Sequence, residues 1–477
     1  MLQSTTTSKG VGGVIVRDHV FSMPLDWTNA AETEHIRVFV RELRAADTTA
    51  SPNVLEGESV AARGPAVMYL QGGPGFPSPR PSAPPGGWMK SALKKGMRVL
   101  LLDQRGTGAS TAVTAQLLDA LHARGGVDLQ LNYLTNMRSD AIAADVEAIR
   151  VALCGPKGKI TLLGQSFGGF CMLSYMSYYP TSLDRCLFTC GLAPITQSIR
   201  EVYTATYRRM ITRNKRFYTR YPADVKKVKS IVEFLSSQPS PVVLPNGGHL
   251  TVRRFLQLGL LLGSGSGMES LHWALENPFF EEPTDGVPGS GALSEHFLFA
   301  VQENQSCFET NPIYWFLHES IYMNGNSTVS GWAAESVMNG SEFKVVFDPL
   351  NALQNEDAVV NFTGEMVFSW MAEDYARLRP YKNLAELVAK KSWDRPLYDL
   401  VALSNSADAI PCAALVSYDD VYVERTFSEA TARLLGDEDA CKLWVSNEFQ
   451  HSGLRDYPGR VFDTLYSMTK GEISLPS

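Results

Sequence analysis

The hexapeptide GQSFGG at residues 164–169 constrains the fold more than any other part of the sequence. It follows the apolar run KITLLG, which predicts a buried strand, and leads into GFCMLSYMSYY, which predicts a helix. A G-x-S-x-G sequence at such a junction predicts a tight turn that lifts the serine hydroxyl clear of the sheet, because the flanking glycines leave room for a strained backbone. Ser166 is therefore the candidate nucleophile.

The backbone near Ser166 predicts an oxyanion hole with two donors. The N–H of Phe167 lies at the start of the predicted helix, where backbone N–H groups have no partner within the helix. The segment QGGPG at residues 71–75 ends the apolar run AVMYL, and glycines there let backbone N–H groups approach a substrate oxygen. We expect Gly73 to supply the second donor, with Gly72 beside it in contact with substrate.

Apolar runs of strand length recur along the chain and alternate with helical patterns. Such alternation predicts a parallel sheet that is buried on both faces. Two β-branched and aromatic runs near the start, residues 14–27 and 34–43, predict an antiparallel strand pair instead. The runs that predict parallel strands lie at residues 66–70, 98–103, 159–164 and 186–194.

A long helical stretch divides the predicted sheet in two. Residues 196–404 carry mainly helical patterns with Gly, Ser and Pro breaks, and strand patterns return at residues 410–420 and 441–451. Together with the serine turn, this arrangement predicts an α/β-hydrolase fold with a mostly parallel sheet and a large, mainly helical cap. We expect residues 1–195 and 405–477 to form the core and residues 196–404 to form the cap.

Charge and cysteine content exclude several classes of protein. The 477-residue chain has a formal net charge of −7 and no Lys/Arg-rich run, so we expect neither a nucleic acid nor a membrane as partner. Seven scattered cysteines lack the spacing of zinc ligands or of a disulfide framework, and no apolar stretch predicts a signal peptide or membrane span. These features predict a cytoplasmic protein, and the cap helices leave a homo-oligomer open.

A serine hydroxyl needs a histidine as general base, and the chain order of this fold is serine, acid, histidine. Elimination leaves His451, in the segment QHSG after the last predicted strand. The other seven histidines either precede Ser166 or lie in the helical stretch: His19, His35, His122, His249, His272, His296 and His318.

The acid of the triad should follow the preceding strand, where the sequence offers three aspartates. Asp419 and Asp420 end the segment AALVSYDD, and Asp408 stands just before it. We favour Asp420, although the pattern alone allows any of the three to be a surface charge.

Five segments, in the same order, resemble the long forms of the proline iminopeptidase (prolyl aminopeptidase) family of α/β-hydrolases. QGGPG stands where that family usually has HGGPG, and GQSFGG matches its serine turn. LLDQRGTGAS at residues 101–110 matches DQRGTGRS, and YDDVYV and QHSGLRD match the C-terminal segments. The sequence departs from the family at Gln71, where His is usual, and at Ala109, where Arg is usual. From the residues alone, we expect Asp103 and Arg105 to form a structural ion pair.

The resemblance narrows the expected reaction and adds site residues. Members of this family remove an N-terminal residue, preferably proline, and bind its free amino group with carboxylates of the cap. The similarity implies Asp420 as the acid, and it implies Glu319 and Glu365 as the amine-binding carboxylates. An apolar pocket for the proline ring is expected among the aromatic residues Phe76, Phe167, Tyr314 and Trp370.

The sequence therefore predicts a serine aminopeptidase that acts through an acyl-enzyme on peptides or small amides with a free N-terminus. The catalytic residues would be Ser166, Asp420 and His451, and this chemistry requires no metal or cofactor. Two alternatives remain, because a fold and a triad do not define a substrate. One is an esterase or another small-molecule serine hydrolase, and the other is a non-catalytic binding protein with this fold.

Overall fold

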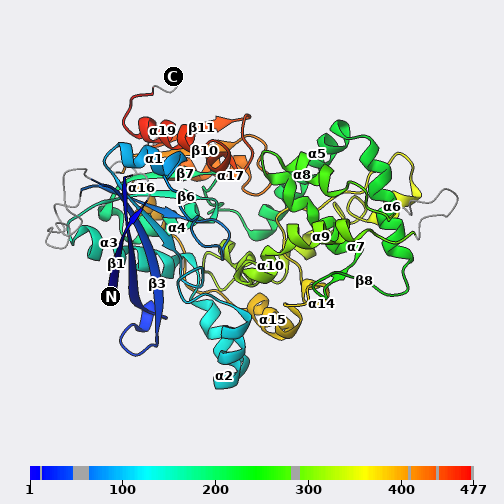
Figure 1. Ribbon diagram of the computed structural model, residues 1–477, viewed down its shortest axis with the longest axis horizontal. Helices are drawn as coiled ribbons and strands as arrows, with labels where there is room; N and C mark the ends of the chain where they lie inside the picture. The colour runs from blue at the N-terminus through cyan, green and yellow to red at the C-terminus, as the bar shows by residue number, and fades with distance from the viewer. Residues whose placement is uncertain (11–12, 47–63, 281–290, 407–409, 437–439, 474–477) are drawn as a thin grey trace.

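The computed structural model describes residues 1–10, 13–46, 64–280, 291–406, 410–436 and 440–473. Figure 1 shows two parts side by side along the long axis of the molecule, a sheet flanked by helices and a mass of inserted helices. Among the described helices, none combines the length and the apolar character needed to span a lipid bilayer.

The described part of the core contains a nine-stranded sheet. The strands, in spatial order, are β1 (Leu2–Gly10), β2 (Val14–Pro24), β3 (His35–Ala45), β5 (Arg98–Asp103), β4 (Ala66–Leu70), β6 (Ile160–Gln165), β7 (Leu183–Thr189), β10 (Cys412–Ser417) and β11 (Cys441–Ser446). The pairs β1–β2, β2–β3 and β3–β5 are antiparallel, and every pair from β5 to β11 is parallel. The predicted mostly parallel sheet and the antiparallel pair near the start are both confirmed. The polar strand β1 was not predicted, because it lacks an apolar alternation.

Helices cover both faces of the parallel strands. On one face, α1 (Gly87–Lys94) and α19 (Pro458–Thr469) pack against each other and against the sheet. On the other face, α3 (Ser139–Cys154) and α4 (Phe167–Tyr178) pack together. Alternate side chains of β4 therefore enter two different apolar clusters, Val67 on the α1 side and Met68 on the α4 side.

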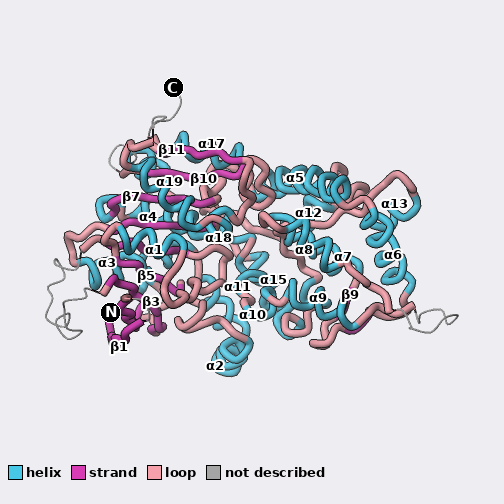
Figure 2. Tube along the Cα trace, turned by 45° about the horizontal axis from the view of Figure 1, so that its top comes forward, coloured by secondary structure: helices cyan, strands magenta, loops and turns pink. Residues whose placement is uncertain are grey.

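The helices between β7 and β10 form most of the second part of the molecule, which Figure 2 shows beside the stacked strands. They are α5 (Ile199–Arg220), α6 (Ala223–Ser237), α7 (Val252–Leu256), α8 (Gly267–Ala274), α9 (Glu295–Gln305), α10 (Cys307–Thr310), α11 (Ile313–Leu317), α12 (Ala333–Met338), α13 (Pro349–Gln354), α14 (Met371–Asp374), α15 (Lys382–Lys390) and α16 (Leu400–Ser406). The remaining helices are α2 (Ala115–Thr135), α17 (Arg425–Leu434) and α18 (Gly453–Asp456), and a short hairpin joins β8 (Val242–Val243) and β9 (His249–Leu250).

A capping box fixes the start of α5, the first of the inserted helices. The Ser198 side chain accepts from the backbone N–H of Glu201, and the Glu201 carboxylate accepts from the backbone N–H of Ser198. Two of the N–H groups that helix geometry leaves without partners are thereby satisfied. The chain leaves the core after β7 and turns into the inserted helices at this point.

The last part of the insertion packs on the core before β10 begins. Helix α16 lies against α4, the backbone N–H of Asp399 donates to Ser177 Oγ at 3.0 Å, and the Tyr178 hydroxyl donates to the carbonyl of Pro396 at 2.7 Å. The helices from α5 to α15 thus stand between two attachments to the core.

The prediction that Asp103 and Arg105 pair with each other is wrong. The buried Asp103 carboxylate accepts from the guanidinium of Arg80 at 2.6 and 2.8 Å and from the backbone N–H of Ala109 at 2.7 Å. Arg105 binds Asp145 of α3 with two hydrogen bonds of 2.7 Å. Both partners lie far away in the sequence, so spacing alone did not reveal them.

Candidate active site

Ser166 lies on the sharp turn between β6 and α4, as the sequence predicts. Its φ and ψ angles are 53° and −125°, an unfavourable conformation for a residue with a Cβ atom. The turn fits because Gly168 lacks a side chain, since a Cβ at that position would lie 2.0 Å from the carbonyl oxygen of Leu70. The backbone N–H of Ser166 donates to the carbonyl of Thr189 at 3.0 Å and ties the turn to the end of β7.

The loop after β4 meets this turn closely. A Cβ on Gly72 would lie only 3.0 Å from the Cβ of Ser166, and Gly73 has a φ of +127°, which an L side chain rarely adopts. The N–H groups of Gly73 and Phe167 have no acceptor in the described part of the chain. Two backbone donors thus remain beside the serine, which is the arrangement that an oxyanion hole requires.

Gln71, one of the departures from the family pattern, holds this loop in place. Its side-chain oxygen accepts from the Tyr69 hydroxyl at 2.7 Å and from the N–H of Gly72 at 3.0 Å. Its amide nitrogen donates to the carbonyl of Pro77 at 3.3 Å. A carboxamide therefore braces both sides of the loop, and the Gly72 N–H is already occupied.

His451 follows β11 and lies against Asp420, which follows β10. Nδ1 of His451 is 2.9 Å from one carboxylate oxygen of Asp420, and the other oxygen accepts from the N–H groups of Tyr422 and Val423 at 2.9 and 3.0 Å. Both side chains are buried. Because Asp420 occupies Nδ1, Nε2 is the histidine nitrogen that remains to act as base.

The pKa of His451 shifts upward. Burial favours the neutral ring and lowers the pKa, but the charge of Asp420 and its hydrogen bond raise the pKa more, and Glu365 adds to the rise. The carboxylate thus stabilises the protonated ring that forms when the serine loses its proton.

The two other candidate acids do not contact His451. Asp419 points to the inserted helices and pairs with Arg216 and Arg209 of α5, at 2.5 and 3.6 Å. Asp408 lies outside the described residues. Of the candidates that the structure describes, only Asp420 adjoins the histidine.

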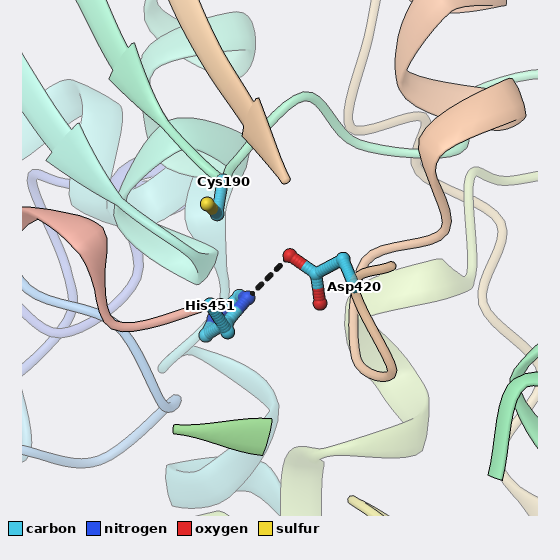
Figure 3. Close-up of side chains that lie close together, drawn as sticks. All are labelled: Cys190, Asp420 and His451. Atoms are coloured by element: carbon cyan, nitrogen blue, oxygen red, sulfur yellow. Dashed lines mark hydrogen bonds and ion pairs between the residues drawn. The ribbon is translucent and has the colours of Figure 1, made fainter. Parts of the chain in front are cut away.

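A cysteine thiol lies close to the histidine and the aspartate. Cys190, at the end of β7, lies with its sulfur within 4.8 Å of ligand atoms of Asp420 and His451, as Figure 3 shows. Burial raises the pKa of Cys190 well above its ordinary value, and the charge of Asp420 adds to the rise. The group at this position is therefore a neutral thiol, which is a poor metal ligand and a suitable neighbour for a carboxylate.

Ser166 and His451 line one cavity of about 380 Å³ between the core and the inserted helices. This volume is in the range of small-molecule sites. The core contributes Gln71, Gly72, Gly73, Phe76, Gln165, Ser166, Tyr422, His451 and Arg455, and the inserted segment contributes Leu260, Leu261, Ser264, Cys307, Tyr314 and Glu365.

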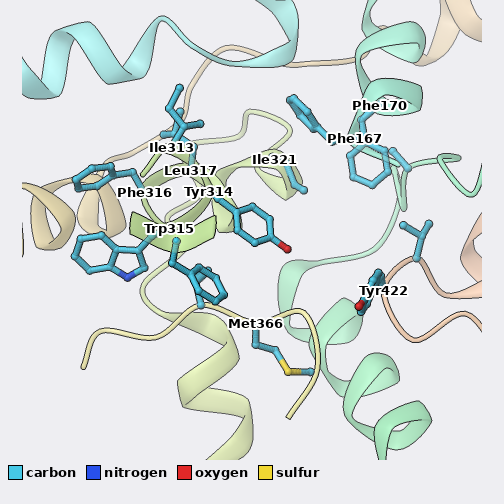
Figure 4. Packing of buried hydrophobic residues seen from close by; sticks show 14 of the residues in the cluster. Phe167, Phe170, Ile313, Tyr314, Trp315, Phe316, Leu317, Ile321, Met366 and Tyr422 are labelled. Carbon is cyan, nitrogen blue, oxygen red and sulfur yellow. The ribbon is translucent and has the colours of Figure 1, made fainter. Parts of the chain in front are cut away.

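Glu365 is the only carboxylate among these lining residues. Its oxygen accepts a hydrogen bond of 2.6 Å from the Tyr314 hydroxyl. Figure 4 shows Tyr314 apart from Trp315 and Phe316, with its hydroxyl directed toward the side of the site where Tyr422 lies. Burial raises the pKa of Glu365 to about 7, although the charge of His451 and the Tyr314 hydrogen bond oppose that rise.

The structure does not bring Glu319, the other predicted carboxylate, to the cavity. It is buried among the inserted helices, where one oxygen accepts from the N–H of Ala334 at 3.0 Å at the start of α12. Burial raises its pKa to about 7, and the backbone donors of α12 oppose the rise. Its position is that of a carboxylate at a helix N-terminus.

Two of the four predicted aromatic residues line the cavity, namely Phe76 and Tyr314. Phe167 is buried beside it against Phe170, and Trp370 stacks on Phe368 at another cavity. Sequence reasoning missed the lining residues Leu260, Leu261, Cys307, Tyr422 and Arg455, and also Cys190 beside Asp420 and His451. For Tyr422 and Arg455, the signal was their closeness in sequence to Asp420 and His451.

Comparisons with known proteins identify the family and the fold. A family model described as alpha/beta hydrolase fold matches residues 65–230. A curated relative, "Proline iminopeptidase" of Aeromonas sobria, is 41% identical over 458 residues, which cover 96% of this chain and 97% of the relative. A second, "Proline iminopeptidase aneH" of Aspergillus aculeatus, is 29% identical, with 95% and 93% coverage.

Among solved structures, the Proline iminopeptidase of Mycobacterium smegmatis is 13% identical, with coverage of 95% of this chain, 100% of that chain and a TM-score of 0.38. The family assignment depends instead on the Aeromonas relative, whose 41% identity extends over nearly the full length of both chains. The protein therefore belongs to the proline iminopeptidase family and has the α/β-hydrolase fold.

Proposed function

We propose that the protein is a serine aminopeptidase that releases an N-terminal residue, preferentially proline, from peptides or small amides. One observation carries the proposal: a carboxylate, Glu365, lines the same cavity as Ser166 and His451. An esterase on this triad has no need of a carboxylate there, whereas a substrate with a free amino group requires a partner for its buried positive charge.

The reaction begins when His451 Nε2 takes the proton of the Ser166 hydroxyl while the oxygen attacks the carbonyl carbon of the N-terminal residue. The backbone N–H groups of Gly73 and Phe167 bind the resulting oxyanion. His451 then gives its proton to the leaving nitrogen, the C–N bond breaks, and an acyl-enzyme remains. Water, deprotonated by His451, attacks the ester carbonyl and releases the amino acid and the serine hydroxyl.

Glu365 selects the free N-terminus in this proposal. With a pKa of about 7, it is about half ionised at neutral pH and mostly ionised above it, and a bound ammonium group further favours the charged form. The Tyr314 hydroxyl orients the carboxylate. We assign Glu319 a structural role at the start of α12 rather than a contact with substrate.

The remaining walls suit a small apolar ring. Phe76, Leu260, Leu261 and Tyr422 surround the space between Ser166 and Glu365 with apolar side chains. A pyrrolidine ring buries its methylene groups there while its nitrogen reaches the carboxylate.

The experiment compares proline p-nitroanilide with N-acetylproline p-nitroanilide. We expect the enzyme to hydrolyse the first, to leave the acetylated compound intact, and to lose activity in Ser166→Ala. Glu365→Gln should lower kcat/KM for the free amine at least about 100-fold, because an uncompensated buried charge is costly. Equal rates on the free and the blocked compound, or better rates on simple acyl esters, would contradict the proposal and favour an esterase.

We also propose a cytoplasmic location. All seven cysteines are free thiols, and Cys171, Cys186, Cys190, Cys412 and Cys441 are buried. Unpaired cysteines in this number are typical of a reducing compartment.

A further inference from the structure

Arg455 is a cation at the edge of the catalytic cavity that the reaction scheme does not use. It lies in α18, four residues after His451, and its exposed side chain lines the cavity. In the described part of the chain, no carboxylate or other acceptor binds its guanidinium group. The nearby Arg460, in contrast, forms an ion pair with Glu448 at 2.6 Å and does not line the cavity.

The positive charge of Arg455 acts on the catalytic groups. Burial raises the pKa of Glu365 to about 7, and Arg455 is among the charges that oppose this rise. The cavity therefore has an anionic group, Glu365, in a loop of the inserted segment and a cationic group, Arg455, on the core segment that carries the histidine.

The two charges match the two ends of a short peptide. Glu365 serves the α-amino group of the N-terminal residue, while His451 must lie next to the leaving nitrogen, which belongs to the following residue. Arg455 lines the same cavity from the core segment that carries His451, whereas Glu365 reaches the cavity from the inserted segment, and on this basis we assign Arg455 to the leaving-group side. In a dipeptide, the residue on that side carries the terminal carboxylate, and guanidinium groups bind carboxylates with paired hydrogen bonds.

We infer that Arg455 binds the terminal carboxylate of the leaving residue, so that the substrates the enzyme prefers are free dipeptides with N-terminal proline. This inference rests on the proposed aminopeptidase function and narrows its substrate class. Each added residue moves the carboxylate away by up to about 3.5 Å, so the contribution of Arg455 is lost in longer peptides.

The test compares Pro-Gly with Pro-Gly-amide, which differ only in the terminal charge. We expect kcat/KM for Pro-Gly to exceed that for the amide about fivefold in the wild type, as an exposed ion pair allows. In Arg455→Met this ratio should fall to about one, and in Arg455→Lys it should stay above one. The matched control Arg460→Met should keep the wild-type ratio and rates.

Ionic strength gives a second readout that a structural role of Arg455 would not affect. At 1 M salt the screening length shrinks to about 3 Å, so the wild-type ratio should approach that of Arg455→Met. A wild-type enzyme that cleaves both compounds equally, or a ratio unchanged in Arg455→Met, overturns the inference alone. An enzyme that cleaves neither Pro-Gly nor its amide overturns the proposed function and the inference with it.

Discussion

Glu365 and His451 line the catalytic cavity, and both have raised pKa values. Glu365 must be ionised to pair with an ammonium group, and His451 must be neutral to accept the serine proton. Lowering the pH therefore inactivates both groups, because each of them takes up one proton.

We predict that kcat/KM for proline p-nitroanilide falls below about pH 7, with a slope that approaches two protons, because Glu365 has a pKa of about 7. Glu365→Gln should have a lower maximum and an acid limb of one proton. Labelling of Ser166 by a neutral fluorophosphonate provides the control, since it needs no ammonium partner and should show one proton in both enzymes. A two-proton limb that persists in Glu365→Gln would contradict the assignment.

Among single residues, sequence order was enough to identify Ser166 and His451 as candidates, but it did not separate Asp419 from Asp420. The direction of each side chain separates them: Asp420 turns to His451, and Asp419 turns to Arg216 of α5. The same limit applies to Glu319, since a sequence motif does not reveal that its carboxylate meets the start of α12.

At the scale of elements, Arg105 joins three segments of the core that are distant in sequence. Its guanidinium binds Asp145 of α3, and it donates to the carbonyls of Pro24, Leu25 and Asn136 at 3.1, 2.7 and 2.8 Å. The Arg105 side chain is buried, so water does not compete for these hydrogen bonds at the guanidinium group. Removing either Arg105 or Asp145 would leave the other charge buried without its partner, which lowers the free energy of unfolding.

Arg105→Met leaves Asp145 buried without its cation, so we expect the free energy of unfolding to fall by about 3–5 kcal/mol. Urea denaturation followed by tryptophan fluorescence would measure the change. Arg124→Met is the matched control, because Arg124 pairs with Glu34 at the surface and its removal should shift the midpoint little. Equal urea midpoints for the two variants would show that the buried ion pair stabilises the fold no more than the surface pair does.

The elements differ in how well the sequence predicts them. Strands β4 and β5 have the bounds of their apolar runs, because a strand buried on both faces requires an unbroken apolar segment. The inserted helices are many and short, and their arrangement depends on contacts between distant aromatic residues such as Tyr207 and Phe347. The sequence predicts that they are helical, but it does not predict which of them line the cavity.

At the scale of the whole molecule, ion pairs join the inserted helices to the core beside the active site. Arg209 of α5 binds Glu424, the residue that caps α17, and also lies 3.6 Å from Asp419. The neighbouring Arg208 binds Glu342, which belongs to the inserted segment itself. Two adjacent arginines therefore differ in whether their partner lies across the boundary.

We predict that Arg209→Met raises KM for proline p-nitroanilide about twofold to threefold at low salt, because the inserted segment that carries Glu365 is held less firmly. The difference from the wild type should vanish at 1 M salt, which screens the pair. Arg208→Met should leave KM unchanged at both salt concentrations. If both variants behave alike, the pairs across the boundary do not influence substrate binding.

The direct pairing of β7 with β10 matters for protein engineering. The inserted chain leaves the core after β7 and returns into β10, and these two strands pair directly with each other. Entry and exit of more than 200 residues thus lie on neighbouring parallel strands, one at the carboxyl end of β7 and the other at the amino end of β10. We predict that the inserted segment, proposed to recognise the amino group, can be exchanged as one piece with that of another family member, and that the exchange transfers substrate preference while the catalytic residues of the core stay in place.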